Sequence, residues 1–464
     1  MATLAFQNYQ LLMFISVAIQ VIFVLAFGAC IGSLVNVLVY RMPLGLDVVS
    51  PPSRCPSCET RLTWRENIPV FGWLRLLGKC RFCRSPISAE YPLVEAFVAV
   101  LWAAVFLVLY GPDTLLGLNL AAIRPEWAIP SGQWGGITQT WPIFLVVLTL
   151  FSCLVAMTLI DAKTCFIPLQ LTIVPVVVAV IAHPLTAWWV QTHMPLGKLP
   201  HTAPGWVWAA ATPDPQHGWY WIGGSIGGVI GLVIANVLLS KGLLRRSFAD
   251  YDQWEEKQLA EQATAAETKG TAAGGEGGEG KKAPEAHPTD LWIQYPHARR
   301  EVLKEVAFLA PCVGLGYLGA ALAAKWVGMV PSQTGGIEFS HSALLWLTVL
   351  AGVFMGYLVG GGAVWAMRIF GTLAFGKEAI GLGDVHMMAA VGACLGWIDP
   401  VLAFFGAAFL GVAWWLVGLV FRGVGRRAMP FGPYLAMGTV LVWFCRPLME
   451  RLLTWMAHVP IHIP

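Results

Sequence analysis

The sequence predicts an all-α polytopic membrane protein with about eight to ten transmembrane helices and a small cytoplasmic zinc-binding domain after the first helix. Hydrophobic residues make up 57% of the 464 residues and charged residues only 12%. That charged share is about half of the value in soluble proteins. Four cysteines fall together in one polar block. The net charge is only +3, so we expect no nucleic-acid-binding surface. We expect membrane lipid to surround the apolar helices.

Ten apolar runs are candidates for the helices. The first, 11–39, is expected to be a transmembrane helix and not a cleaved signal peptide, because it is too long and lacks both a basic flank and a clear cleavage site. The run 385–397 is short for a full crossing, so we expect a partial one. The runs lie at 11–39, 93–110, 141–160, 168–188, 218–240, 303–327, 342–370, 385–397, 401–421 and 433–455.

Composition divides the chain into five expected parts. The region 245–300 is rich in Glu, Lys, Ala and Gly and buries too little apolar surface to fold, which predicts a flexible loop. The parts are the first transmembrane helix (1–39), a cytoplasmic four-cysteine zinc domain (40–91), transmembrane helices carrying Asp161 (92–240), a flexible cytoplasmic insert (241–302), and transmembrane helices carrying Asp384 (303–464).

Lysine and arginine indicate the orientation, because cytoplasmic segments carry an excess of both. If the N-terminus lies outside and the runs alternate in direction, 24 of the 29 basic residues fall inside. Asp161 ends one apolar run and Asp384 begins another, and this orientation brings both to the cytoplasmic face. Two carboxylates at one membrane depth meet the geometric condition for a catalytic pair.

The polar block after the first run holds two Cys-x2-Cys pairs, with 21 residues between them. Four thiolates at this spacing can surround one tetrahedral Zn²⁺ ion and leave no open position, which indicates a structural zinc. A disulfide pairing does not suit the reducing cytoplasm. A redox site and unmetalled thiols are the alternatives. The four residues are Cys55, Cys58, Cys80 and Cys83.

The two aspartates have settings that favour chemistry. Asp384 ends the Gly-Leu-Gly-Asp turn 381–384, and Asp161 ends the run 141–160. A carboxylate at the edge of hydrocarbon is costly to ionise and rarely accidental. Two such groups side by side share one proton, so one can deprotonate water while the other donates, which suits amide hydrolysis without a covalent intermediate. The alternative is that each aspartate only caps or turns a helix end.

An ordered set of short motifs runs along most of the chain. They are 32–37 with 41–43, the two cysteine pairs, 67–69, 78–81, 91–95, Asp161 with 167–168, 381–384, 392–397 and 430–434. With these motifs the chain resembles the type IV prepilin peptidases, which are GxGD-type membrane aspartic proteases of type IV pilus and type II secretion systems. A bare GxGD is a weak signal, but this ordered set is highly specific.

The resemblance implies that Asp161 and Asp384 are the catalytic aspartates. They would cleave a basic leader, after a glycine, from prepilins and pseudopilins at the cytoplasmic face of the bacterial inner membrane. Many members then methylate the new N-terminus with S-adenosylmethionine, an activity linked to the cysteine-bearing block. Glu95 ends its matching motif and is a candidate for the cofactor-binding site. Peptidase activity without methylation is the alternative.

Some features depart from the family pattern. The family usually has short loops, whereas 111–140, 189–217 and 245–300 are enlarged here. His386 stands where a lysine is expected two residues after the GxGD aspartate, which alters the field around the pair without removing it. Lys163 and Glu378 are further charges near the aspartates in sequence; they either tune the pair or are ordinary interfacial charges.

Two other classes of protein remain as alternatives. An ion-coupled transporter with a zinc-ribbon accessory would use the acids as ion sites, but transporters usually hold such acids near the midplane and have related halves. Here both acids are expected at one face, and no inverted repeat is evident. A non-enzymatic scaffold for pilus or secretion assembly would leave the two aspartates without a role.

Overall fold

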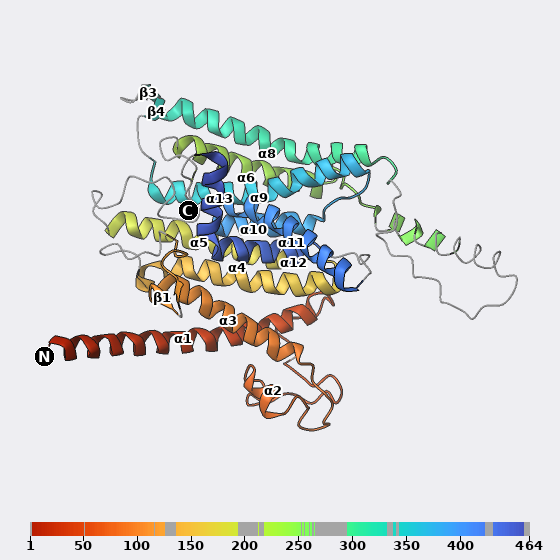
Figure 1. The fold of residues 1–464 in the computed structure, drawn as a ribbon. Helices are drawn as coiled ribbons and strands as arrows, with labels where there is room; N and C mark the ends of the chain where they lie inside the picture. The colour runs from red at the N-terminus through yellow and green to blue at the C-terminus, as the bar shows by residue number, and fades with distance from the viewer. Residues whose placement is uncertain are drawn as a thin grey trace.

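The computed structural model is a bundle of long helices (Figure 1). Within the part of the chain that it describes, eight helices are long and apolar enough to cross a membrane, which confirms the expected all-α membrane class. The structure describes residues 2–50, 52–115, 117–125, 136–193, 212, 218–251, 253–254, 256–258, 260–261, 264, 295–331, 337–339, 343–422 and 430–458.

The eight long helices form a layered arrangement. α1 lies along α3 at one side of the bundle and α6 lies along α8 at the other, with the remaining helices between them (Figure 1). The helices are α1 (Ala2–Arg41), α3 (Glu90–Tyr110), α4 (Ile137–Thr164), α5 (Leu169–His193), α6 (Gly218–Ser240), α8 (Ala298–Val327), α9 (Leu345–Phe375) and α11 (Ile398–Arg422). The outer helices keep exposed apolar side chains, as expected for helices that face lipid.

Three shorter helices complete the bundle. α10 (Leu382–Leu395) has only 14 residues, in agreement with the short run at 385–397, and a partial crossing there stays a prediction. The prediction of one span at 433–455 is wrong, because the chain forms α12 (Gly432–Phe444) and α13 (Arg446–Ala457) with a break at Cys445. A proline in the first turn of α13 has no N–H to donate to the preceding turn, so the helix restarts there.

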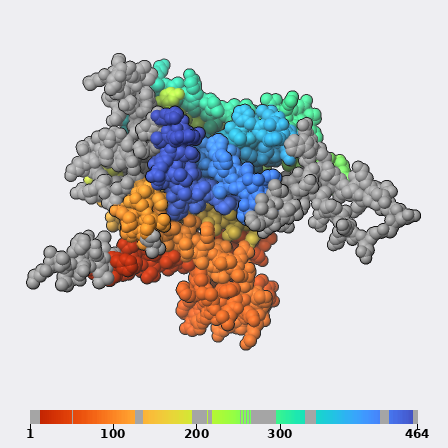
Figure 2. Space-filling view, in the orientation of Figure 1, coloured from red at the N-terminus to blue at the C-terminus, as the bar shows by residue number. Residues whose placement is uncertain are grey.

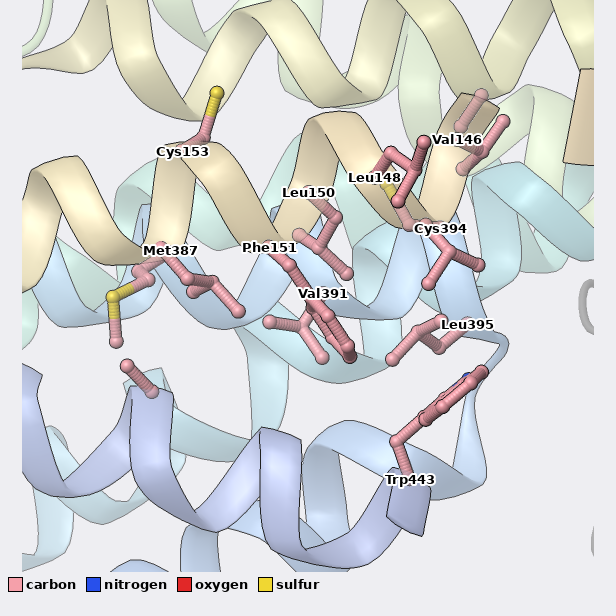
Figure 3. Close-up of a cluster of buried hydrophobic side chains, with 14 of the residues drawn as sticks. Val146, Leu148, Leu150, Phe151, Cys153, Met387, Val391, Cys394, Leu395 and Trp443 are labelled. Atoms are coloured by element: carbon pink, nitrogen blue, oxygen red, sulfur yellow. The ribbon is translucent and has the colours of Figure 1, made fainter. Parts of the chain in front are cut away.

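α10 is the centre of the hydrophobic core. Side chains of α4, α10 and α12 meet in one buried cluster, in which Phe151, Val391 and Trp443 lie together (Figure 3). The approach of α9 to α10 depends on two glycines, since a Cβ on Gly356 or Gly392 would overlap the carbonyl oxygen of the other. The close packing on both sides fixes the position of the helix that begins at the 381–384 turn.

The four-cysteine block projects from the bundle as a separate lobe beside α1 and α3 (Figure 2). It holds the short helix α2 (Phe71–Arg75) and two isolated antiparallel bridges. Among the described residues of 40–91, Cys55 and Cys80 are the only hydrophobic side chains that are fully buried. The block therefore has almost no apolar core of its own.

Two small antiparallel hairpins lie between helices. β1 (Thr114–Leu115) pairs with β2 (Leu118–Asn119), with Thr114 opposite Asn119. β3 (Met329–Pro331) pairs with β4 (Ile337–Phe339), with Met329 opposite Phe339. Most of the enlarged segments 189–217 and 245–300 lies outside the described residues, as do residues 116 and 126–135 of the segment 111–140.

The two ends of the 241–302 insert are packed, which differs from the flexible loop that its composition predicts. Phe248 and Tyr295 are buried together with Ala298, and Tyr251 and Trp254 pack against them. The low apolar content that predicts a flexible loop is an average over the whole region. The aromatic side chains at its two ends bury enough surface to order those ends.

Candidate active site and metal centre

Asp161 lies in the last turn of α4 and is only 6% exposed. The helix ends there because Cys165 adopts a left-handed φ of 51° and a proline follows three residues later. Oδ2 of Asp161 accepts a 3.1 Å hydrogen bond from the N–H of Gly432, the first residue of α12. A Cβ at that glycine would lie 2.5 Å from Oδ2, so only glycine lets the two groups meet undisturbed.

Asp384 lies in the first turn of α10 and is 8% exposed. Gly383, just before it, packs on Ile167, and a Cβ there would lie 2.9 Å from Cβ of Ile167. The same isoleucine lies against Gly432, which donates to Asp161. Ile167 thus lies against both the residue before Asp384 and the residue that donates to Asp161. The structure thus brings the two sequence-predicted aspartates together at one end of the bundle.

This arrangement has the components of a proton-sharing carboxyl pair. Two neighbouring buried carboxyls repel each other when both are charged, which favours a state in which they share one proton. A pair of this kind can accept a proton from water and donate one to a carbonyl oxygen in the same step. Burial among apolar helices strengthens the charge interactions of both groups.

The neighbouring charges have partners of their own. Lys163 forms an ion pair with Glu90, at the start of α3, and does not pair with either aspartate. Glu378 forms an ion pair with Arg368 of α9. His386 lies half-buried in α10, one turn or less from Asp384.

Two residues near the pair are not evident from sequence reasoning. Gly432 lies within a family motif, but its role as the N–H donor to Asp161 joins positions 271 residues apart. Arg368 counts in the sequence only as one of many basic residues inside. In the structure it is 1% exposed, and it donates a hydrogen bond to the carbonyl oxygen of Ile380, just before the 381–384 turn.

The four cysteines meet in space as predicted. Their sulfur atoms all lie within 4.8 Å of one another, with 3.7 Å between Cys55 and Cys83 and 3.9 Å between Cys58 and Cys80. Backbone N–H groups of Cys58 and Ser57 hydrogen-bond to the sulfur of Cys55 and lower the pKa of its thiol to about 6. Such donors favour the thiolate form that binds metal.

Each cysteine pair is built in the same way. The N–H of Cys55 donates to Thr60 O at 3.0 Å, and that of Cys80 donates to Ser85 O at 2.9 Å. The residue after each second cysteine, Glu59 or Arg84, is left-handed, with φ of 55° and 57°. Four sulfur donors on two matching turns, in a block without an apolar core, fit a tetrahedral metal ion.

Glu95 lies where the four-cysteine block joins the helices. Its backbone packs on Gly32 of α1, where a Cβ would lie 2.6 Å from the Glu95 Cα. Its carboxylate accepts a 2.6 Å hydrogen bond from Val70 N–H, just before α2, and another from the Ser33 side chain. Glu95, itself a residue of α3, thus connects the block to α1 and α3. It follows the four cysteines in the sequence and is not one of their neighbours there.

Comparison with known proteins supports the family resemblance. Residues 26–109 match the model of the Bacterial Peptidase A24 N-terminal domain. The prepilin leader peptidase/N-methyltransferase of Myxococcus xanthus is 47% identical over 83 residues, which cover 18% of this chain and 25% of that protein. The protein of the same name from Aeromonas hydrophila is 32% identical over 174 residues, 32% of this chain and 50% of that protein. The one from Klebsiella pneumoniae is 39% identical over 103 residues, 21% of this chain and 45% of that protein.

The chain thus spans about half or less of the length of these curated relatives. No solved structure matches it significantly. The chain is thus similar, over part of its length, to proteins named prepilin leader peptidase/N-methyltransferase, and none of these relatives is named as a transporter.

Proposed function

We propose that this protein is a membrane-embedded aspartic endopeptidase that removes the leader from type IV prepilins and type II secretion pseudopilins. Asp161 and Asp384 are the proposed catalytic residues. The placement of these two buried carboxyls around Ile167, through Gly383 and Gly432, is the observation that carries the proposal. The excess of basic residues in the segments at that end supports its assignment to the cytoplasmic face of the bacterial inner membrane.

In the proposed reaction, a water molecule attacks the carbonyl carbon of the scissile peptide bond. The ionised aspartate takes a proton from the water, while the protonated aspartate donates its proton to the carbonyl oxygen. When the C–N bond of the resulting tetrahedral intermediate breaks, the aspartate that took the proton of the water gives it to the leaving amine. The other aspartate takes a proton back from a hydroxyl of the intermediate, which restores the pair and leaves a carboxylic acid. Gly432 N–H holds Asp161 in a fixed orientation throughout.

The position of the pair suits a prepilin substrate. The pair lies where apolar helices end, and the polar block and the insert leave the bundle at the same end (Figure 1). An apolar substrate helix can therefore stay among the membrane helices while a basic leader stays in water. The 381–384 turn lets substrate backbone approach Asp384 closely, because its glycines carry no side chain.

The four cysteines are proposed to hold a structural Zn²⁺ ion. The ion would supply the cohesion that the block lacks, since Cys55 and Cys80 are its only fully buried hydrophobic residues among those described. The names of the relatives support N-methylation of the new N-terminus as a second activity, and S-adenosylmethionine is the proposed methyl donor. Glu95, at the junction of block and helices, is the proposed residue of the methyl-donor site.

Incubation of the detergent-solubilised protein with a prepilin tests the proposed function. A shift of the pilin to lower mass on a gel, with a new N-terminus directly after the leader glycine, is the expected result. An unchanged pilin would instead favour the transporter or the scaffold. Mass spectrometry of the same product separates a peptidase that also methylates from one that does not, because methylation adds one methyl group to the new N-terminus.

Gly432→Ala is expected to lower the kcat of cleavage by about 10²-fold, because the new Cβ displaces the Asp161 carboxylate. The clash distance of 2.5 Å is well inside van der Waals contact. Gly411→Ala is the matched control, since a Cβ at that position of α11 meets nothing within 4 Å. Equal rates for the two variants would exclude a role for the Gly432 contact.

A further inference from the structure

Arg368 ties the end of α9 to the turn that carries Asp384. Its guanidinium is 1% exposed and forms an ion pair with Glu378. The same nitrogen donates to the carbonyl oxygen of Ile380, the residue directly before the 381–384 turn. Arg368 therefore bonds to the segment before the turn twice, at the Glu378 side chain and at the Ile380 backbone.

Arg368 also forms an ion pair with a second carboxylate, that of Glu305. Nε of Arg368 lies 2.8 Å from Oε1 of Glu305 in α8, which is itself 2% exposed. Trp365 Nε1 donates to the other oxygen of Glu305 at 3.1 Å. A buried ion network whose members are hydrogen-bonded in this way resists change of geometry.

The packed ends of the insert cover the network. Oγ of Ser247 donates to Oε1 of Glu305 at 3.1 Å, and the Phe248 ring lies over the guanidinium with 5.4 Å between ring centroid and Cζ. Backbone N–H of Phe248 donates to Oε2 of Glu301 at 2.8 Å. The start of the insert is thus fixed to α8 and to Arg368.

The C-terminal end of the insert bonds to the end of α9 and to the start of the insert. Backbone N–H of Tyr295 donates to the carbonyl of Gly376 at 2.8 Å, where α9 ends, and its hydroxyl donates to Oδ1 of Asp250 at 2.6 Å. We name Ser247, Phe248, Asp250 and Tyr295 the insert clasp. The clasp contacts the segment between α9 and Asp384 at Gly376, and it contacts Arg368, which in turn bonds to that segment.

We propose that Arg368 is a positioning residue for Asp384, and that the insert clasp holds Arg368 in place. The inference rests on the proposed function and adds a role for the insert, whose length the cleavage reaction does not by itself explain. The hydrogen bonds of Arg368 go to Glu305 and to the segment before the turn, and the Phe248 ring lies over its guanidinium. Arg368 affects the reaction by fixing the position of Asp384 and does not contact the substrate.

Arg368→Gln is the first test of the proposal. The kcat of prepilin cleavage is expected to fall by about 10²-fold, because a small displacement of a catalytic group has that effect. The KM for prepilin is expected to stay within about twofold, since the arginine does not contact substrate. Arg124→Gln, at the other end of the bundle, is the matched control, because Arg124 is also a buried arginine bonded to a carboxylate and to backbone carbonyls.

Arg368→Lys keeps the protein testable if the neutral variant does not fold, since lysine retains the charge and lacks the fork that reaches Glu305 and Ile380 together. Its kcat is expected to lie between those of the natural protein and Arg368→Gln. A lysine variant with the natural kcat would overturn the positioning role.

A double-mutant cycle tests the clasp. Phe248→Ala alone is expected to lower kcat by about tenfold, through loss of the contact with the guanidinium. The same substitution added to Arg368→Gln is expected to lower kcat no further, because both act through one group. Leu243→Ala, outside the clasp and exposed, is the control. Additive losses, or a change in KM alone, would overturn the proposal.

Asp384→Asn, measured beside these variants, separates the two levels of inference. If Asp384→Asn is inactive and Arg368→Gln keeps the natural kcat, the positioning role fails and the peptidase stands. If Asp384→Asn cleaves normally, the proposed function fails and the positioning role fails with it.

Discussion

Asp161→Asn and Asp384→Asn are each expected to abolish prepilin cleavage, with a loss of at least about 10²–10⁴-fold in kcat. An asparagine keeps the shape of the side chain but can neither hold nor release the shared proton. Because the two carboxyls act as one unit, the double variant is expected to be no slower than either single variant. The measurement is the rate of appearance of the mature pilin, per folded molecule, in detergent.

Asp399→Asn is the matched control for both substitutions. Asp399 is also a buried carboxylate in the helix bundle, 2% exposed, and it pairs with Arg446 at 3.4 Å. It lies beyond the end of α10 that is opposite to Asp384, and the 14 residues of α10 span about 20 Å at 1.5 Å per residue. Its variant is expected to keep natural cleavage, and normal cleavage by either dyad variant would refute the catalytic pair.

Cys55→Ser and Cys80→Ser are expected to reduce bound zinc from about one ion per chain to near zero, since three sulfur ligands and a hydroxyl hold the ion far more weakly. The block is then expected to lose its fold, because these two side chains are also its only fully buried hydrophobic groups among the described residues. Elemental analysis of freshly purified protein measures the metal. Protease sensitivity of the 40–91 region measures the fold.

Methylation is expected to be lost in these cysteine variants before cleavage declines. Asp161 and Asp384 belong to α4 and α10, which are packed in the core of the bundle, whereas the cysteines belong to the projecting block. Cys30→Ser, in α1 and outside the cluster, is the control and should keep both zinc and methylation. Fresh natural protein without zinc, or equal loss of both activities, would contradict this assignment.

The sequence predicts the parts of this protein that local patterns determine. Apolar run length predicts the long apolar helices and the short length of α10, and cysteine spacing predicts the sulfur cluster. The common location of Asp161 and Asp384 follows from the distribution of basic residues, without any knowledge of packing. Each of these features depends on residues close in sequence or on composition.

Long-range packing explains what the sequence does not predict. The contact between Gly432 and Asp161 joins residues 271 positions apart, and no local pattern marks it. The break at Cys445 is different, because Arg446, Glu450 and Arg451 make α13 much less apolar than α12, a local signal that the prediction of one span at 433–455 overlooks. The contact between Phe248 and Arg368 is hidden because a few aromatic residues are averaged into a polar insert.

The closeness of the two aspartates is tested most directly by cross-linking. Asp161→Cys is combined with Asp384→Cys in a Cys165→Ser background, and the protein is treated with a short bifunctional thiol reagent. Mass spectrometry then identifies the joined peptides, while a monofunctional reagent reports that each new thiol is accessible. The pair Asp161→Cys with Asp399→Cys serves as the distant control. We expect a link between positions 161 and 384 and none between 161 and 399; accessible thiols at 161 and 384 that do not join would contradict a shared proton and a single active site.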